Sequence, residues 1–143
     1  GFSIPDNVRV IGTMNTADRS IALVDHALRR RFAFLPLYPD YDLIRRRAAD
    51  LRYPVENLIR VLQRINQTIS DPNYALGVSF FFNGNTIEDL EEIWRLEIEP
   101  YLEELFFDQP ARMNDFRWEK IREAVLSDDG KAAHGDGTGS PDN

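Results

Sequence analysis

Hydrophobic residues recur in the middle of the chain with the spacing of amphipathic helices. Residues 55–69 show this most clearly, because an apolar residue returns every three or four positions and forms one helical face. The residues of that face are Val55, Leu58, Ile59, Leu62 and Ile65. The pattern also predicts helices at 42–51, 86–107 and 112–126. Within 86–107, Pro100 should kink the helix or start a second segment.

The first 40 residues follow a different pattern. Residues 8–14 and 32–37 are short, apolar runs, which predicts two strands of a buried, parallel sheet. Residues 19–31 lie between them, with apolar positions at helical spacing. Since two strands are too few to make a parallel sheet of their own, we expect this region to be the end of a larger α/β core.

The predicted elements divide the chain into three parts. Residues 1–40 are the end of an α/β core, and 41–126 form a helical subdomain. Residues 127–143 are mostly Gly, Asp, Ser and Pro, which predicts a disordered tail. The expected fold class is therefore mostly α with a few short strands, and we expect the chain to be a fragment of a larger protein.

Composition mainly excludes classes of protein. A chain of 143 residues with 43% hydrophobic residues is long enough for one ordinary core. It has no apolar run of the roughly 20 residues that a membrane span needs, and no secretory leader. We therefore expect a cytoplasmic protein without a membrane partner. There is no cysteine, and the two histidines are scattered, so no metal site is expected.

The charge is distributed unevenly, although the net charge is −7. Residues 17–64 contain ten arginines and six acids, whereas 86–104 contain eight acids and one arginine. This asymmetry favours a focused site for an anion over general coating of nucleic acid. The triplet Arg45-Arg46-Arg47 lies on a predicted helix outside any motif, and we interpret it as a solvated face.

Two blocks of residues carry a specific resemblance. Met14-Asn15-Thr16-Ala17-Asp18-Arg19-Ser20 follows the first predicted strand, and Ala27-Leu28-Arg29-Arg30-Arg31-Phe32 ends the next helix. Together with 100–108, they resemble the McrB family of AAA+ GTPases from modification-dependent (type IV, 5-methylcytosine-specific) restriction systems. The resemblance implies the C-terminal part of a AAA+ P-loop NTPase module, namely the end of the α/β core plus a helical lid.

The resemblance also implies roles for the residues of both blocks. Asn15 would be sensor 1, whose amide can donate to a phosphate oxygen and accept from the attacking water. Asp18 and Arg19 would organise the nucleotide site or the subunit boundary. Arg30 and Arg31 would be arginine fingers. By position alone, Asn15 could simply turn the chain, and Arg30 and Arg31 could simply favour a helix C-terminus.

A further nucleotide-binding candidate, Ser79, comes from the segment 76–82. The segment occupies the place where related modules have the sensor-2 part of the lid. Val78 and Phe80 depart from the family pattern there. The alternative is that Phe80, Phe81 and Phe82 pack into the core of the lid.

The resemblance implies several partners and cofactors for the parent protein. These are GTP (or ATP) with Mg²⁺, a hexameric ring of identical subunits, an McrC-like endonuclease subunit, and DNA bound through an N-terminal domain absent from this sequence. The sequence contains no P-loop and no strand that ends in Asp-Glu. We therefore expect this chain alone neither to bind nucleotide tightly nor to hydrolyse it. Two alternatives stay open, a MoxR-like remodelling ATPase and a non-catalytic helical interaction module.

Overall fold

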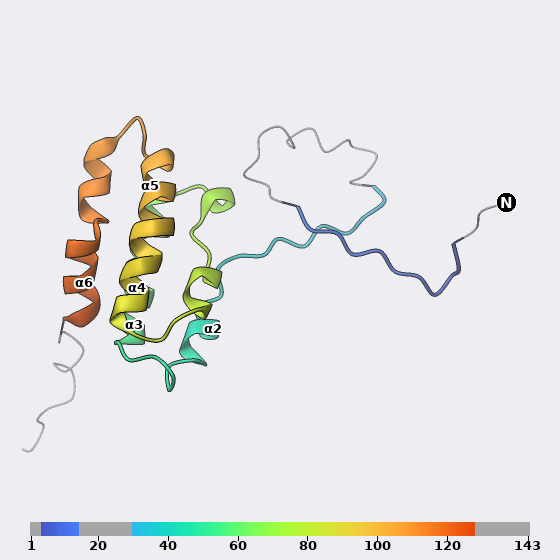
Figure 1. Ribbon diagram of the computed structural model, residues 1–143. Helices are drawn as coiled ribbons and strands as arrows, with labels where there is room; N and C mark the ends of the chain where they lie inside the picture. The colour runs from blue at the N-terminus through green and yellow to red at the C-terminus, as the bar shows by residue number, and fades with distance from the viewer. Residues whose placement is uncertain (1–3, 15–29, 128–143) are drawn as a thin grey trace, which may run out of the picture. The chain divides into compact units, whose positions relative to one another are not determined.

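The computed structural model describes residues 4–14 and 30–127. The chain divides into two compact units, Gly1–Leu37 and Tyr38–Asn143, which we describe separately. The described residues are mostly helical and contain no strand. The α-helices, labelled in Figure 1, are α2 (Asp42–Arg45), α3 (Val55–Ile69), α4 (Ile87–Ile93), α5 (Glu99–Leu105) and α6 (Trp118–Leu126). None of the described helices is long and apolar enough to cross a membrane.

Helix α3 is the centre of the second unit. Its predicted apolar face is confirmed, because Leu58, Ile59, Leu62 and Ile65 are all buried. Helices α2 and α6 both pack against it. The buried side chain of Asn57 fixes the α6 contact by donating to the main-chain oxygens of Val125 and Ser127, at 2.9 and 2.8 Å.

Helices α4 and α5 form one continuous helical run, joined by a π-helical turn, η4 (Trp94–Ile98). In this turn the N–H of Glu99 donates to the carbonyl of Trp94, five residues earlier. Pro100 lies in the first turn of α5, where its missing N–H is tolerated. The predicted second segment, α5, begins one residue before Pro100, at Glu99, but it follows the π-helical turn without a break in the helical run.

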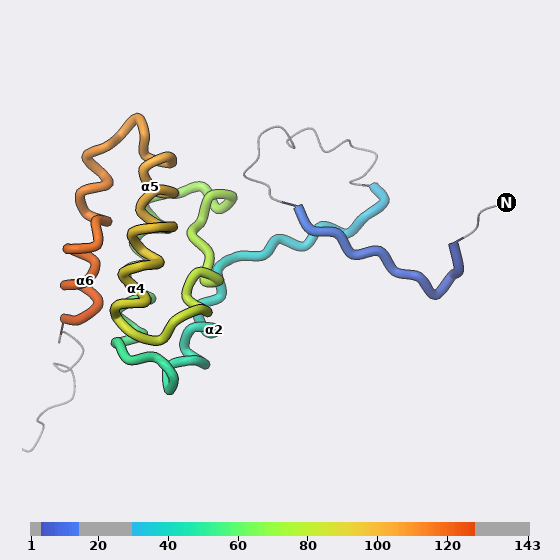
Figure 2. Tube along the Cα trace, in the orientation of Figure 1, coloured from blue at the N-terminus to red at the C-terminus, as the bar shows by residue number. Residues whose placement is uncertain are grey.

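Helix α6 runs antiparallel to the helical run of α4, η4 and α5 and lies beside it, as the trace in Figure 2 shows. Arg95 joins the two by an ion pair with Glu119 at 2.8 Å. The rings of Trp94 and Trp118 lie 6.4 Å apart in the core between them. The core of this unit also contains Ile44 of α2, Phe81 of η3 and Leu90 of α4.

Two predicted helices have different bounds in the structure. The helix expected at 42–51 ends at Arg45 and continues as turns. The helix expected at 112–126 begins only at Trp118, because Arg117 is extended (φ −66°, ψ 145°). Residues Pro110–Asp115 form a 3₁₀ helix, η5. The break gives α6 its own N-terminus, and there the N–H of Trp118 donates to the buried carboxylate of Glu99 at 2.7 Å.

The strands expected in the first unit are not found. Residues 8–14 and 32–37 have no ladder hydrogen bonds, and several of their apolar side chains are largely exposed, such as Ile11 at 93% and Leu37 at 94%. The physical reason is that a parallel strand needs neighbouring strands to pair with, and the described residues of this unit supply none. Most of the helix expected at 19–31 and the tail after 127 lie outside the described residues.

Candidate functional site

The residues predicted to act on nucleotide are described only in part. Asn15, Asp18 and Arg19 lie outside the described residues. Arg30 and Arg31 lie in a turn, and both are exposed. Neither side chain has a hydrogen-bond or ion-pair partner among the residues that the structure describes. Within the part of the chain that the structure describes, both guanidinium groups are therefore exposed without a partner.

The sensor-2 candidate lies in the other unit. Ser79 is the first residue of a 3₁₀ helix, η3 (Ser79–Phe82), and is exposed. The aromatic residues around it divide between core and surface. Phe81 is buried and Phe80 packs partly against the core, whereas Phe82 is 41% exposed. The predicted packing into the core of this unit is therefore confirmed for Phe81, partial for Phe80 and wrong for Phe82.

Asn66 of helix α3 holds Leu76, the first residue of the segment 76–82. The side-chain oxygen of Asn66 accepts from the N–H of Leu76 at 2.7 Å, and its nitrogen donates to the carbonyl of Leu76 at 3.1 Å. The same nitrogen donates to the hydroxyl of Tyr41 at 2.9 Å. One amide thus satisfies both main-chain groups of Leu76, whose side chain is buried.

Arg47, in the turn after α2, holds the end of the segment 76–82. Its Nη1 donates to the carbonyl of Phe81 and its Nη2 to the side-chain oxygen of Asn85, both at 2.9 Å. Arg45 instead pairs with Asp42 and Glu56, both at 2.7 Å. The prediction of a solvated arginine face is therefore wrong for Arg47, which is half-buried. No local sequence pattern signals this contact, because the partners of Arg47 are 34 and 38 residues away.

A tight turn leads from η3 into α4. Gly84 has a φ of +83°, and the next residues form a capping box between Thr86 and Asp89. The carboxylate of Asp89 accepts from the N–H of Thr86 at 2.9 Å and from that of Asn85 at 2.8 Å. These two hydrogen bonds, that of Thr86 foremost, hold the pKa of Asp89 below its ordinary value.

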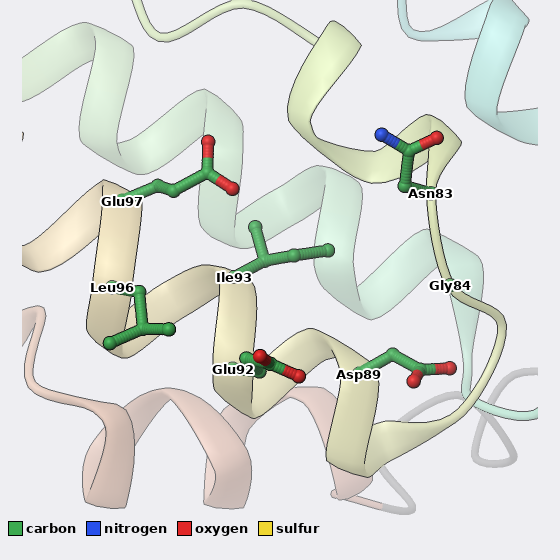
Figure 3. Close-up of a pocket in the computed structure, with 7 residues that line it drawn as sticks. All are labelled: Asn83, Gly84, Asp89, Glu92, Ile93, Leu96 and Glu97. Carbon is green, nitrogen blue, oxygen red and sulfur yellow. The ribbon is translucent and has the colours of Figure 1, made fainter.

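A shallow pocket of about 250 Å³ lies beside this turn (Figure 3). It is lined by Asn83, Gly84, Asp89, Glu92, Ile93, Leu96 and Glu97. Three of these residues are acids, so the pocket repels polyphosphate and does not fit a nucleotide. No group of three or more His, Cys, Asp or Glu side chains able to hold a metal ion occurs within the described residues.

Two comparisons with known proteins bear on this arrangement. Residues 57–114 match the family model of the McrB α-helical lid domain, and that range includes all of α3 but its first two residues, together with η3, α4 and α5. The chain is also similar to the "Type IV methyl-directed restriction enzyme EcoKMcrB subunit" of Escherichia coli (strain K12). The two are 40% identical over 131 residues, which covers 78% of this chain and 28% of that protein. The chain thus spans little more than a quarter of the length of this relative.

Proposed function

This chain is an McrB-type chain whose residues 57–114 are the α-helical lid domain, and we propose that it works within a AAA+ GTPase of a modification-dependent restriction system. In this proposal residues 1–40 end the α/β core and carry sensor 1 and the arginine fingers, and 41–126 form the lid. The single observation that supports it most is the lid match, whose range 57–114 contains η3 and its exposed first residue, Ser79.

The catalytic roles are those that the resemblance to the McrB family implies, and the chemistry of each side chain suits its role. Asn15 orients the attacking water in its own subunit, since a neutral amide can both donate and accept. Asp18 and Arg19 organise the same site. Arg30 and Arg31 reach the nucleotide of a neighbouring subunit, where an arginine finger is worth about 10³-fold or more in turnover. Their exposure and their lack of partners among the described residues fit this role.

The lid contributes to nucleotide binding through Ser79. Its exposed position at the start of η3 leaves the hydroxyl available to a phosphate oxygen. Mg²⁺, bound with GTP, would neutralise part of the phosphate charge. The acidic pocket beside α4 plays no part in this. The same proposal includes a hexameric ring in the cytoplasm, an McrC-like endonuclease subunit, and DNA bound elsewhere in the protein.

The test is nucleotide hydrolysis by the full-length protein, with GTP and ATP compared side by side. Arg30→Ala should lower GTP turnover about 10³-fold while nucleotide affinity, measured separately by titration, stays within a few fold. Arg46→Ala is the matched control, because Arg46 is also the middle residue of an arginine triplet and its side chain has no partner among the described residues. This control should keep full turnover.

Two results would redirect the proposal. Faster hydrolysis of ATP than of GTP would favour the MoxR-like alternative. Equal turnover in Arg30→Ala and the wild type would remove the arginine-finger assignment, and equal loss of turnover and affinity would indicate a structural role for Arg30.

A further inference from the structure

Arg47 links two parts of the lid that are far apart in sequence. It lies in the turn after α2, and its guanidinium bridges the carbonyl of Phe81 and the side chain of Asn85. Phe81 lies near the end of η3, where carbonyl groups have no partner inside the helix. Arg47 therefore satisfies a main-chain group that the short helix itself leaves open.

Both main-chain polar groups of Asn85 are hydrogen-bonded to other parts of the lid. Its N–H donates to the carboxylate of Asp89 at 2.8 Å, and its carbonyl accepts from the N–H of Arg52 at 2.8 Å. Arg47 adds a bond to the side chain of the same residue. The guanidinium thus connects η3 to a residue that α4 and the 46–53 turn already hold in place.

The geometry argues against a direct contact between Arg47 and a ligand. Both terminal nitrogens already donate within the lid, and the side chain is half-buried. Arg46, one position earlier, is exposed. Arg47 is therefore placed to act through η3, and not on a phosphate itself.

We propose that Arg47 is a positioning residue for nucleotide binding, because it holds η3, and with it Ser79, in one backbone arrangement before the nucleotide arrives. The proposal rests on the proposed function for the role of Ser79. A segment that is ordered in advance loses less conformational entropy when its ligand binds. Without Arg47, that ordering would occur only on binding, and affinity would fall while the chemical step stays the same.

The first experiment compares steady-state GTP hydrolysis in the full-length protein. Arg47→Ala should raise KM about tenfold, as expected for the loss of hydrogen bonds from a charged group, while kcat stays within about twofold. Arg46→Ala should change neither. Arg47→Lys should recover only part of the affinity, because one ammonium group cannot reproduce a planar guanidinium that donates to two acceptors, the carbonyl of Phe81 and the side chain of Asn85. A loss of fold would lower kcat as well, so the split between KM and kcat separates positioning from stability.

The second experiment asks whether Arg47 acts through Ser79. Ser79→Ala should raise KM by a similar factor, and the double variant should be no weaker than the worse single variant, since residues acting through one contact are not additive. In the same proteins, amide hydrogen exchange across 79–85 should speed up in Arg47→Ala and not in Arg46→Ala.

The outcomes separate this proposal from the proposed function. If the wild type hydrolyses nucleotide and Arg47→Ala has an unchanged KM, or an effect additive with Ser79→Ala, the positioning role is wrong. If the wild type hydrolyses neither nucleotide, the proposed function fails, and hydrogen exchange at 79–85 alone decides whether Arg47 holds η3. If Arg47→Ala does not fold, the same comparisons are made with Arg47→Lys, and an unchanged KM there overturns the role.

Discussion

A single methyl group added at Gly84 should destabilise the lid. The Gly84 φ of +83° is a left-handed conformation that glycine adopts freely and other residues do not. A β-carbon added there would collide with the β-carbon of Asp89 and lie 2.9 Å from its γ-carbon. Those atoms are at the base of the Asp89 side chain, so the helix itself must shift to make room.

The expected cost of Gly84→Ala has two parts. An L-residue in the left-handed region costs about 1–2 kcal/mol. Displacing Asp89 breaks the capping box of α4, and losing an N-cap costs about 0.5–2 kcal/mol. The sum is about 1.5–4 kcal/mol, which for a unit of about 100 residues corresponds to a fall in Tm of roughly 7–20 °C.

The assay is thermal and urea unfolding followed by circular dichroism, with Gly77→Ala as the matched control. A β-carbon at Gly77 meets only the Ser79 hydroxyl oxygen, at 3.8 Å, so this variant should stay within about 1 kcal/mol of the wild type or gain slightly. Equal stabilities for the two variants would refute the reasoning. A large loss in Gly77→Ala would show that the whole 76–85 segment tolerates no added group.

Three further predictions concern the polar contacts of the lid. The lowered pKa of Asp89 means that its contribution to stability is full above its ordinary value of 3.8 and is lost as pH falls through the lower, folded pKa. Asp89→Asn should therefore flatten the decline in urea midpoint below that pH, and an unchanged decline would contradict this. Glu99→Ala should cost about 2–4 kcal/mol in urea unfolding, because it leaves the N–H of Trp118 buried without an acceptor, whereas Glu104→Ala, at an exposed position nearby, should cost little. Asn66→Ala should lower the free energy of unfolding by about 1–3 kcal/mol and accelerate amide exchange at Leu76, because both main-chain groups of Leu76 lose their partner. Unchanged exchange would mean that the buried Leu76 side chain alone holds the segment 76–82.

The sequence predicted those elements of the lid that depend on local periodicity. Helix α3 has the predicted bounds of Val55–Ile69, because its apolar stripe is continuous and Pro54 precedes it. The start of α6 was mispredicted, because residues 112–117 also have plausible helical spacing. Its actual start depends on Glu99, 19 residues earlier, which no local pattern reveals.

In the candidate site, too, some residues could be predicted from the sequence and others depend on contacts between distant residues. The motif residues Asn15, Asp18, Arg19, Arg30 and Arg31 could be named from resemblance alone, and their roles stay predictions. Arg47 could not be named, because an arginine triplet near a helix end is typical of a solvated face. Only the fold brings its guanidinium to the carbonyl of Phe81.

The most direct test of the central claim, an active site shared between subunits, is subunit mixing in the full-length protein. Asn15→Ala and Arg30→Ala should each abolish GTP turnover alone. Mixed in equal amounts, they should regain activity, because in a ring about a quarter of the interfaces then pair an intact Asn15 with a neighbour's intact Arg30. If mixed rings form and stay inactive, Asn15 and Arg30 do not act across the subunit boundary, and the account is wrong.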